Sequence, residues 1–316
     1  MKNAIKYRLC ALFMAWVLTA GMSAETVRAA ELSSVVQLTS TYTYEEMIND
    51  ITELCAKYPG IVSCASAGTS VMGRNIPYLI LGNPAAPHSI MIQSSIHGRE
   101  YIVSQTTMAT AEYYAMQFSA GNLPDVFAST CFYIIPMANP DGVAIAQSIA
   151  PDWKANANGV DLNRNFPTAW EFTKGAASPG AANFKGFFPA SEPETLAVMG
   201  LAGARNYSCY ISYHQQGNIV YYDDDLTSPV VSALSTALAS TVGSINRYAL
   251  VNTSGTNASG TTTYGGFGDY VLITLQKPGI TVECGSAYGA RGQGQCSSIY
   301  LKNADTWAAA ARLFAQ

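Results

Sequence analysis

The sequence predicts an α/β fold in which one mixed, mostly parallel sheet is covered by helices on both faces. Short apolar runs typical of buried strands alternate along the chain with longer stretches typical of helices. Three of these runs lead to His97, His214 and Glu283, which are residue types that bind or assist zinc. Because the loops after parallel strands collect functional groups at one edge of a sheet, we expect these three side chains to converge.

The order of strands and helices is predicted from turn residues and capping signals. Thr43 and Glu46 have the spacing of a capping box, which should begin a helix that reaches about Lys57. Strands are expected at residues 61–67, 77–81, 89–93, 130–136, 209–213 and 279–282. Further helices are expected at residues 100–118, 191–203, where Ser191 is the expected cap, and 228–249. The sequence Asn139-Pro140-Asp141-Gly142 predicts a turn.

Residues 1–30 have the pattern of a secretory signal peptide. Three basic residues precede an apolar stretch of 14 residues, Leu9–Met22, and small-residue cleavage options follow it. A membrane anchor is the alternative, but the stretch is shorter than the ~20 residues that span a bilayer. We therefore expect residues 31–316 to form one folded domain that is secreted, periplasmic or cell-wall associated, without a stable membrane anchor.

Charge and cysteine content narrow the choice of partners and compartment. The chain has a formal net charge of −4, and residues 1–30 carry four basic residues against one acidic residue, so residues 31–316 are more negative still. Because of this negative charge, nucleic acid is not expected as a partner. We also expect the protein to be a monomer. Six cysteines follow residue 30, which permits disulfides. Cys55–Cys64 and Cys284–Cys296 would each close a short loop, although other pairings stay open.

His97 and Glu100 have the i, i+3 spacing that brings two side chains to one side of a helix start. A catalytic zinc ion takes three protein ligands from His, Glu, Asp and Cys, and keeps a fourth position for water. The chain has three histidines, and His214 at a predicted strand end is the candidate third ligand. His88 precedes the strand that leads to His97, and we expect it to lie in a surface loop.

Glu283 is the candidate general base. A carboxylate beside a metal ion can take a proton from the attacking water and pass it to the leaving amine. The alternative is a glutamate that forms a structural salt bridge at a strand end. Glu283 follows Ile280-Thr281-Val282 and has no basic neighbour in the sequence, so no local ion-pair partner is evident.

Five motifs occur in a fixed order along the chain: His97-Gly98-Arg99-Glu100, Asn139-Pro140-Asp141-Gly142, Gly159-Val160-Asp161-Leu162-Asn163-Arg164-Asn165-Phe166-Pro167, Ser212-Tyr213-His214 and Thr281-Val282-Glu283. Together they resemble the motif series of zinc metallocarboxypeptidases of the carboxypeptidase A type, over roughly residues 42–312. The resemblance implies a single domain with an eight-stranded sheet, in which residues 31–316 form a zinc peptidase catalytic domain. It also implies one zinc ion per chain and a peptide substrate.

The resemblance assigns roles around the metal. His97, Glu100 and His214 match the zinc ligands of the family, and Glu283 matches its general base. Asp161 matches an acid that orients the first ligand histidine, as expected for a residue that supports a metal-bound imidazole. Without the resemblance, the segment Asp161-Leu162-Asn163-Arg164 would be interpreted as an ordinary polar loop.

The resemblance also implies how substrate is held. Asn163 and Arg164 match the pair that binds the terminal carboxylate of the substrate, which suits a guanidinium fork. Arg99 matches an arginine that contacts substrate, with a surface ion pair as the alternative. Lys154 stands where the digestive enzymes have an arginine that stabilises the oxyanion; lysine keeps the charge but lacks the bidentate fork.

Two positions depart from the pattern of the digestive enzymes. Their mobile substrate-capping tyrosine falls on Thr261, and the nearby Tyr264 is the candidate that could replace it. Gly268 falls where those enzymes have a residue that sets side-chain selectivity. We therefore expect a pocket floor that is open or shaped by other residues.

These departures resemble one bacterial branch of the family, whose members cut γ-D-glutamyl-diaminopimelate bonds in peptidoglycan peptides. The matching segments are Trp153-Lys154-Ala155-Asn156, residues 161–167, Gly265-Gly266-Phe267-Gly268-Asp269-Tyr270 and Gln276-Lys277-Pro278-Gly279. The resemblance implies a cell-wall peptide as substrate. A secreted carboxypeptidase that releases C-terminal amino acids is the alternative, because Arg164 suits both substrates. A secreted zinc-binding protein without catalysis is a further alternative, although all three ligand positions and the base are filled.

Overall fold

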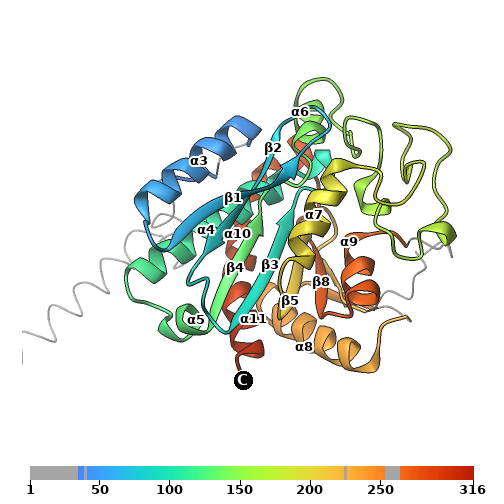
Figure 1. The fold of residues 1–316 in the computed structure, drawn as a ribbon. Helices are drawn as coiled ribbons and strands as arrows, with labels where there is room; N and C mark the ends of the chain where they lie inside the picture. The colour runs from blue at the N-terminus through green and yellow to red at the C-terminus, as the bar shows by residue number, and fades with distance from the viewer. Residues whose placement is uncertain (1–34, 39–40, 224–225, 253–263) are drawn as a thin grey trace, which may run out of the picture. The chain divides into compact units, whose positions relative to one another are not determined.

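Eight strands form one mixed sheet in the computed structural model, in the order β1-β2-β4-β3-β5-β8-β6-β7 (Figure 1). The structure describes residues 35–316 except 39–40, 224–225 and 253–263. The strands are β1 Val62–Thr69, β2 Asn75–Leu81, β3 His88–Ser94, β4 Thr130–Ile135, β5 Cys209–His214, β6 Ile219–Tyr221, β7 Ala249–Val251 and β8 Gly279–Glu283. The predicted mixed sheet of eight strands is confirmed.

The centre of the sheet is a block of four parallel strands. β4, β3, β5 and β8 are parallel neighbours. β2 and β6 pair antiparallel with the two ends of this block, while β1 pairs antiparallel with β2 and β7 pairs parallel with β6. The three strands predicted to lead to site residues, β3, β5 and β8, are therefore adjacent, and their carboxyl ends lie at one edge of the sheet.

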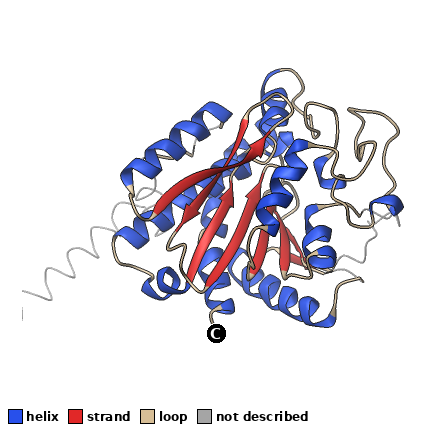
Figure 2. Cartoon of the chain, viewed as in Figure 1, coloured by secondary structure: helices blue, strands red, loops and turns tan. Residues whose placement is uncertain are grey.

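Helices cover both faces of the sheet (Figures 1 and 2). In the view of Figure 1, α7 lies in front of the central strands, whereas α4 and α10 lie behind them. The α-helices within the described residues are α3 Tyr44–Lys57, α4 Ile102–Ser119, α5 Pro124–Ser129, α6 Pro140–Ser148, α7 Pro193–Gly203, α8 Pro229–Asn246, α9 Phe267–Asp269, α10 Cys296–Asn303 and α11 Thr306–Phe314. Three 3-10 segments also lie near the site: η1 Gly98–Glu100, η2 Leu162–Arg164 and η5 Gly289–Gln295.

Side chains along β4 alternate between two apolar layers. Phe132 packs against Tyr114 of α4 and Trp307 of α11, with ring centroids 5.6 and 5.7 Å apart. Tyr133 instead belongs to the core that includes Val198 of α7. Every residue of β4 is buried, as expected for a strand that lies between two helical layers. The two layers fix the central strands from both sides and so give a rigid base to the loops at their carboxyl ends.

The predicted capping signals are only partly confirmed. Thr43 begins α3 as expected, since its side chain accepts a hydrogen bond from the backbone of Glu46 and its own N–H donates to the Glu46 carboxylate. The cap predicted at Ser191 is wrong: α7 begins at Pro193, and the Ser191 hydroxyl donates to the side chain of Glu192. Proline suits the first helical position, which explains the later start.

The turn predicted at residues 139–142 is also wrong, because these residues begin α6. The Asn139 side chain accepts a hydrogen bond from the N–H of Gly142 at 2.9 Å, and Pro140 occupies the first turn. The helix predicted at 228–249 ends earlier, at Asn246, because Arg247 adopts a left-handed conformation with φ of 61°. The chain beyond it forms the short strand β7.

His88 does not lie in a surface loop as predicted. It is the first residue of β3, is half-buried, and its Nδ1 lies 3.3 Å from the Ser208 hydroxyl. The apolar pattern that predicted β3 therefore starts one residue earlier than expected. The position is at the amino end of the strand, opposite the edge that carries His97.

The predicted signal peptide, residues 1–30, lies outside the described residues. Within the part that the structure describes, no helix is long and apolar enough to cross a membrane. None of the six cysteines in that part forms a disulfide, so the predicted pairs Cys55–Cys64 and Cys284–Cys296 are absent. Cys284 and Cys296 instead contact Asn303 and Gln105, respectively.

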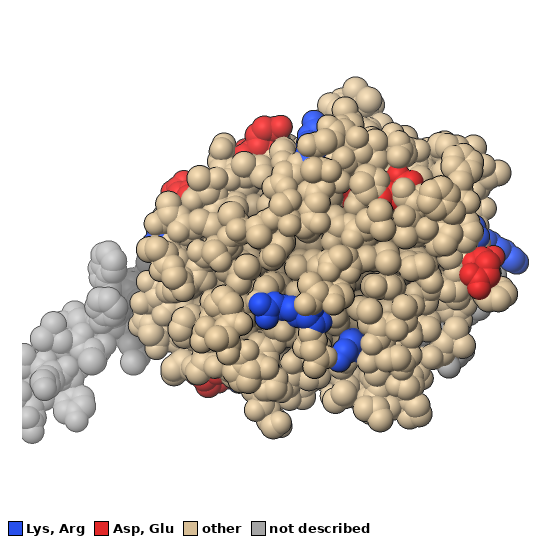
Figure 3. All heavy atoms as spheres, in the orientation of Figure 1, with Lys and Arg blue, Asp and Glu red and all other residues tan. Residues whose placement is uncertain are grey.

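Charged side chains are sparse on the face of the molecule shown in Figure 3. Lysine, arginine, aspartate and glutamate make up 12% of the chain, and on this face the two signs are scattered among uncharged residues. This face therefore presents no broad field of one sign to a charged ligand.

Candidate metal centre

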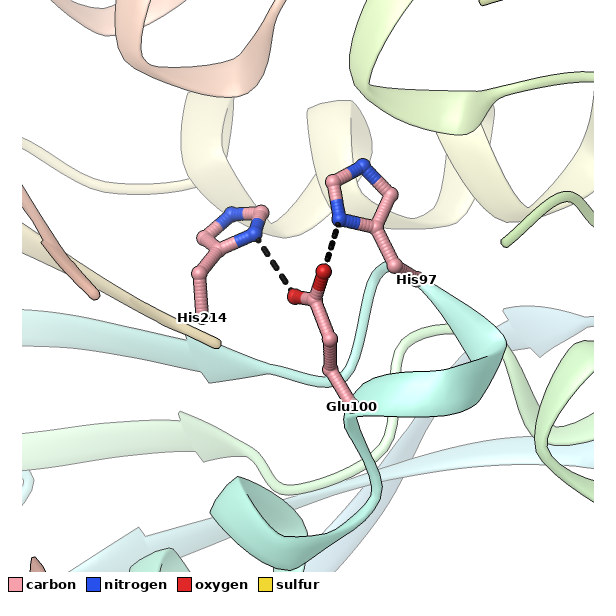
Figure 4. Close-up of side chains that lie close together, drawn as sticks. All are labelled: His97, Glu100 and His214. Atoms are coloured by element: carbon pink, nitrogen blue, oxygen red, sulfur yellow. Dashed lines mark hydrogen bonds and ion pairs between the residues drawn. The ribbon is translucent and has the colours of Figure 1, made fainter. Parts of the chain in front are cut away.

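His97, Glu100 and His214 meet at the carboxyl edge of the sheet (Figure 4). The Nδ1 atom of His97 lies 2.7 Å from Oε1 of Glu100, and the Nδ1 atom of His214 lies 3.1 Å from Oε2. The Glu100 carboxylate thus lies between the two imidazole rings, each facing one of its oxygens. All three residues are buried, with exposed fractions between 1% and 5%.

The local backbone explains how the three side chains meet. His97 precedes η1, in which residues three apart lie on the same side, so Glu100 projects beside His97. His214 is the last residue of β5, the parallel neighbour of β3. Gly98 allows η1 to pass close to α6, because a Cβ atom there would lie 2.3 Å from the backbone oxygen of Gly142.

The donor set fits a zinc ion. One ligand atom from each of His97, Glu100 and His214 can be chosen so that all lie within 4.8 Å of one another, and no other such group of three or more His, Cys, Asp or Glu occurs within the described residues. Two imidazole nitrogens and one carboxylate oxygen are typical catalytic zinc ligands and leave a coordination position for water.

The ionisation of Glu100 suits the binding of a cation. Burial by itself would raise the pKa of Glu100, but the neighbouring His97 and His214 hold it below its ordinary value. Burial likewise opposes the charged form of His214, whose pKa is nevertheless raised by the hydrogen bond and charge of Glu100. The Glu100 carboxylate is therefore ionised, as a metal ligand must be.

Asp161 fixes the orientation of the first histidine. Its Oδ1 lies 3.2 Å from Nε2 of His97, so the Nδ1 atom of that ring stays directed at Glu100. Its other oxygen accepts a hydrogen bond from the Lys154 ammonium at 2.7 Å. Burial opposes ionisation of Asp161, but Lys154 and then His97 keep its pKa well below the ordinary value. A carboxylate that holds the second nitrogen of a ligand histidine is a common support for a metal site.

Glu283 lies beside this cluster without belonging to it. It is the last residue of β8 and pairs in register with His214 of β5. Its Oε2 atom is buried, and within the described residues it has no hydrogen-bond partner. Burial is the main cause that raises the pKa of Glu283 to about 7, while His214 opposes the shift. Near neutral pH this carboxylate can therefore both accept and release a proton.

Asn163 and Arg164 lie on η2, which follows Asp161 directly. The Asn163 side-chain oxygen accepts a hydrogen bond from the N–H of Phe267 at 2.8 Å and so holds the start of α9. Arg164 is half-buried and donates to the backbone oxygen of Asn163 at 2.5 Å. The two residues thus follow Asp161, which contacts His97.

Arg99 and Lys154 line a cavity of about 410 Å³ next to the proposed zinc ligands His97, Glu100 and His214. Lys154 donates to Asp161 and also lies 3.3 Å from the side-chain oxygen of Asn183. Asn183 lies in an irregular loop and could not be recognised as a site residue from the sequence. Tyr264 is half-buried. Thr261, the position that matches the capping tyrosine, lies within residues 253–263 and is therefore outside the described residues.

Asn139 is a second residue whose role near the site was missed. Its side-chain nitrogen donates to the backbone oxygens of Ile96 and Ala155, both at 3.1 Å. The N–H of Gly98 donates to the backbone oxygen of Lys154 at 3.1 Å. These bonds tie the loop that carries His97 to the loop that carries Lys154. The Asn-Pro helix-start signal could have indicated that Asn139 is a cap, but not these tertiary contacts.

Two buried imidazoles and a carboxylate lie next to a second carboxylate, one oxygen of which has no partner in the part of the chain that the structure describes. This arrangement is typical of a metal-dependent hydrolase. The family model for zinc carboxypeptidases matches residues 47–292 of the chain. The chain therefore belongs to the zinc carboxypeptidase family. It is a peptidase of this zinc-dependent family, and the cluster of His97, Glu100 and His214 suits one zinc ion.

Individual relatives agree with this assignment. The chain is 27% identical over 287 residues to gamma-D-glutamyl-L-diamino acid endopeptidase 1 of Lysinibacillus sphaericus, which covers 82% of this chain and 69% of that protein. It is 28% identical over 210 residues to carboxypeptidase A5 of Macaca fascicularis, covering 63% and 48%. The crystal structure of carboxypeptidase A from Helicoverpa armigera shares the fold, with a TM-score of 0.76, 19% identity and coverage of 96% and 86%.

Proposed function

We propose that this zinc peptidase is exported and hydrolyses the amide bond of γ-D-glutamyl-diaminopimelate peptides derived from peptidoglycan. The catalytic part rests on Glu283, which pairs in register with His214 and whose buried Oε2 has no hydrogen-bond partner among the described residues. The substrate is supported by the similarity to an endopeptidase that is named for γ-D-glutamyl-L-diamino acid bonds. Both substrate candidates carry a free carboxylate next to the bond that is cut.

In this proposal His97, Glu100 and His214 hold zinc, which when bound polarises the substrate carbonyl and makes water more acidic. Glu283 accepts a proton from the attacking water and then delivers it to the leaving amine. Its raised pKa suits both transfers, because the group is neither permanently ionised nor permanently protonated near neutral pH. Asp161 keeps the His97 ring in its observed orientation throughout.

Lys154 is proposed to stabilise the negative charge that develops on the carbonyl oxygen. An ammonium group has three donors, and here two are directed at Asp161 and Asn183. The remaining donor is available to the oxyanion, and the two bonds already made hold the group in place. Lysine can therefore replace the arginine of the digestive enzymes as a fixed point charge rather than as a fork.

Arg164 and Asn163 are proposed to hold the carboxylate of the residue that is released. Arg164 uses one of its nitrogens for the Asn163 backbone, which leaves further donors for a planar carboxylate. Tyr264 is proposed to contact the substrate from the loop beyond residue 263. Gly268 is proposed to border the pocket for the substrate side chain; a Cβ at this position would lie 3.3 Å from the Thr281 hydroxyl.

Export is proposed from the pattern of residues 1–30, with residues 31–316 as the catalytic domain. The mature enzyme would then meet peptidoglycan peptides in the periplasm, at the cell wall or outside the cell. We propose that it acts as a monomer, because the described site is assembled from a single chain.

A general carboxypeptidase is the second candidate, favoured by the similarity to carboxypeptidase A5. A side-by-side assay distinguishes the two: purified zinc enzyme is given a γ-D-glutamyl-diaminopimelate peptide and an ordinary peptide with a free C-terminus. We expect faster cleavage of the first, complete loss after chelation and recovery with zinc. Preference for the ordinary peptide would reject the wall-peptide substrate, and activity that is indifferent to chelator would reject the mechanism.

A further inference from the structure

The cavity beside the proposed zinc ligands is lined by one cation, Arg99, that has no carboxylate in ion-pair contact within the described residues. Its acidic and basic side chains otherwise pair: Lys154 with Asp161, and Asp152 with Arg291 at the rim. Arg99 lies on the cavity wall, and it does not form an ion pair with any carboxylate of the described residues. Its Nη1 reaches only the backbone oxygen of Asp152, at 3.5 Å. Within the described residues, Arg99 therefore brings a positive charge to the cavity wall without a direct carboxylate contact, although its charge also acts on Glu283.

Stacking holds the Arg99 guanidinium in a defined position. Its central carbon lies 4.3 Å from the ring centroid of Tyr288, which is a cation–π contact. Its Nε atom is buried and has no hydrogen-bond partner in the described part of the chain. A buried donor without a partner is costly, so a ligand that accepts its hydrogen bond is favoured. A guanidinium that is stacked on one face still presents its edge, the part that binds a planar carboxylate.

Arg164 does not line the cavity that contains Arg99. Lys154 and Asp161 form one end of it, and Asp161 in turn contacts His97, whereas Asn163 and Arg164 do not line it. If Arg164 holds the residue that is released, the cavity receives the residue that precedes the cut bond. A volume of about 410 Å³ is in the range of small-molecule binding sites.

We infer that Arg99 selects substrates in which the residue before the cut bond carries a free carboxylate. A γ-linked glutamyl residue has such a group, its α-carboxylate. This inference rests on the proposed function, which sets the direction in which the substrate lies in the site. It adds a second substrate carboxylate, on the other side of the cut bond, that the enzyme binds. Conversion of that carboxylate to a carboxamide removes its charge and leaves Arg99 without an anionic partner.

The test compares two γ-D-glutamyl-diaminopimelate peptides that differ only in the α-carboxylate or α-carboxamide of the glutamyl residue. Wild-type enzyme should cleave the carboxylate peptide about 10- to 100-fold more efficiently in kcat/KM, the range for a hydrogen-bonded charged pair. Arg99→Gln should lose most of this preference by slowing the carboxylate peptide alone. Arg291→Gln is the matched control, because Arg291 stacks on the same Tyr288 ring at 5.0 Å but is exposed and paired with Asp152.

Several outcomes decide the inference. Equal cleavage of the two peptides by wild type would overturn it, and this result does not depend on any variant folding. Equal slowing of both peptides in Arg99→Gln, with normal zinc content, would also overturn it. A second pair of ordinary peptides, with Glu or Gln before the cut bond, separates this inference from the substrate proposal. If only the ordinary peptides are cut, the wall-peptide substrate is rejected, and the Glu over Gln ratio then tests Arg99.

Discussion

His214 and Glu283 are directly paired in register at the ends of the parallel strands β5 and β8, yet their side chains have different partners. His214 turns its Nδ1 to Glu100, whereas the Oε2 of Glu283 is buried without a hydrogen bond in the described part of the chain. Neighbouring strands lie about 4.8 Å apart, so the sheet itself holds the two groups close. One strand end thus supplies a candidate ligand and the next a candidate base.

Glu283→Gln should separate metal binding from turnover. The amide keeps the size of the side chain but cannot accept the proton of the attacking water, so we expect kcat to fall by about 10²- to 10⁴-fold. Zinc content should stay at one per chain, because Glu283 is not among the three clustered residues. Metal analysis and steady-state kinetics on the same preparation check both points. A variant with near-normal kcat would show that the base lies elsewhere.

The acid side of the pH profile should report Glu283. Burial raises the pKa of this carboxyl to about 7 in the metal-free chain, and a bound zinc ion would favour the ionised form and lower it. Since the base must be ionised to accept a proton, kcat/KM should fall as pH falls through a pKa at or below about 7. Profiles of the zinc enzyme between about pH 4 and 9 test this. An acid limb that persists unchanged in Glu283→Gln would assign it to another group.

The sequence indicated the metal site because the candidate residues follow directly after apolar runs that are typical of buried strands. Residues that end adjacent parallel strands must meet at one sheet edge, so His97, His214 and Glu283 could be grouped before any geometry was known. Assigning Asp161 and Arg164 needed the motif resemblance, since residues 159–167 have no periodic pattern. The structure then explains the order of the motif: Asp161 contacts His97, and Arg164 follows one helical turn later.

The cavity and its loops could not be predicted in the same way. Lys154 and Asn183 come from irregular segments far apart in sequence, and their contact depends on how two loops fold over each other. Asn139 was misread because Asn-Pro begins turns and helices alike, and only the helical hydrogen bond to Gly142 decides between them. Local sequence signals therefore predicted the candidate metal ligands and the candidate base, whereas tertiary contacts among loops determine the shape of the substrate site.

Asp161→Asn should weaken the zinc site without emptying it. The amide can still contact His97, but it loses the charge that favours the observed ring orientation and that holds Lys154. Loss of such a supporting carboxylate is expected to reduce zinc affinity or activity by about 10- to 100-fold. Competition with a chelator of known affinity measures the first, and kinetics at saturating zinc measure the second.

Asp141→Asn is the matched control for this variant. Asp141 is also a buried carboxylate paired with a cation, since it accepts from Arg74 at 2.6 Å, but it contacts none of the three clustered residues. We expect it to reduce the free energy of unfolding without changing zinc affinity of the folded enzyme. Equal zinc affinities of the Asp161 and Asp141 variants would refute the supporting role of Asp161.

Zinc should stabilise the fold through His214. A ligand that binds only the native state adds about 2.7 kcal/mol to the free energy of unfolding at 100 times its dissociation constant. The zinc-dependent rise in Tm should be present in wild type, nearly absent in His214→Asn, and normal in His88→Asn. His88 is the matched control, because it lies at the opposite end of β3 and contacts Ser208. Full zinc occupancy of His214→Asn would remove His214 from the ligand set.

Arg164→Ala should mainly affect substrates with a free carboxylate on the released residue. The guanidinium is half-buried on η2 and uses one nitrogen for the Asn163 backbone, so truncation removes the donors proposed to hold that carboxylate. We expect kcat/KM to fall about 10- to 100-fold, chiefly through KM, because binding contacts are lost while Glu283 and the metal cluster stay intact. The same peptide with its terminal carboxylate blocked as an amide should be cleaved slowly and almost equally by wild type and variant. A loss of the same size on both peptides, at equal zinc content, would place the effect of Arg164 in the architecture of η2 rather than in recognition of the carboxylate.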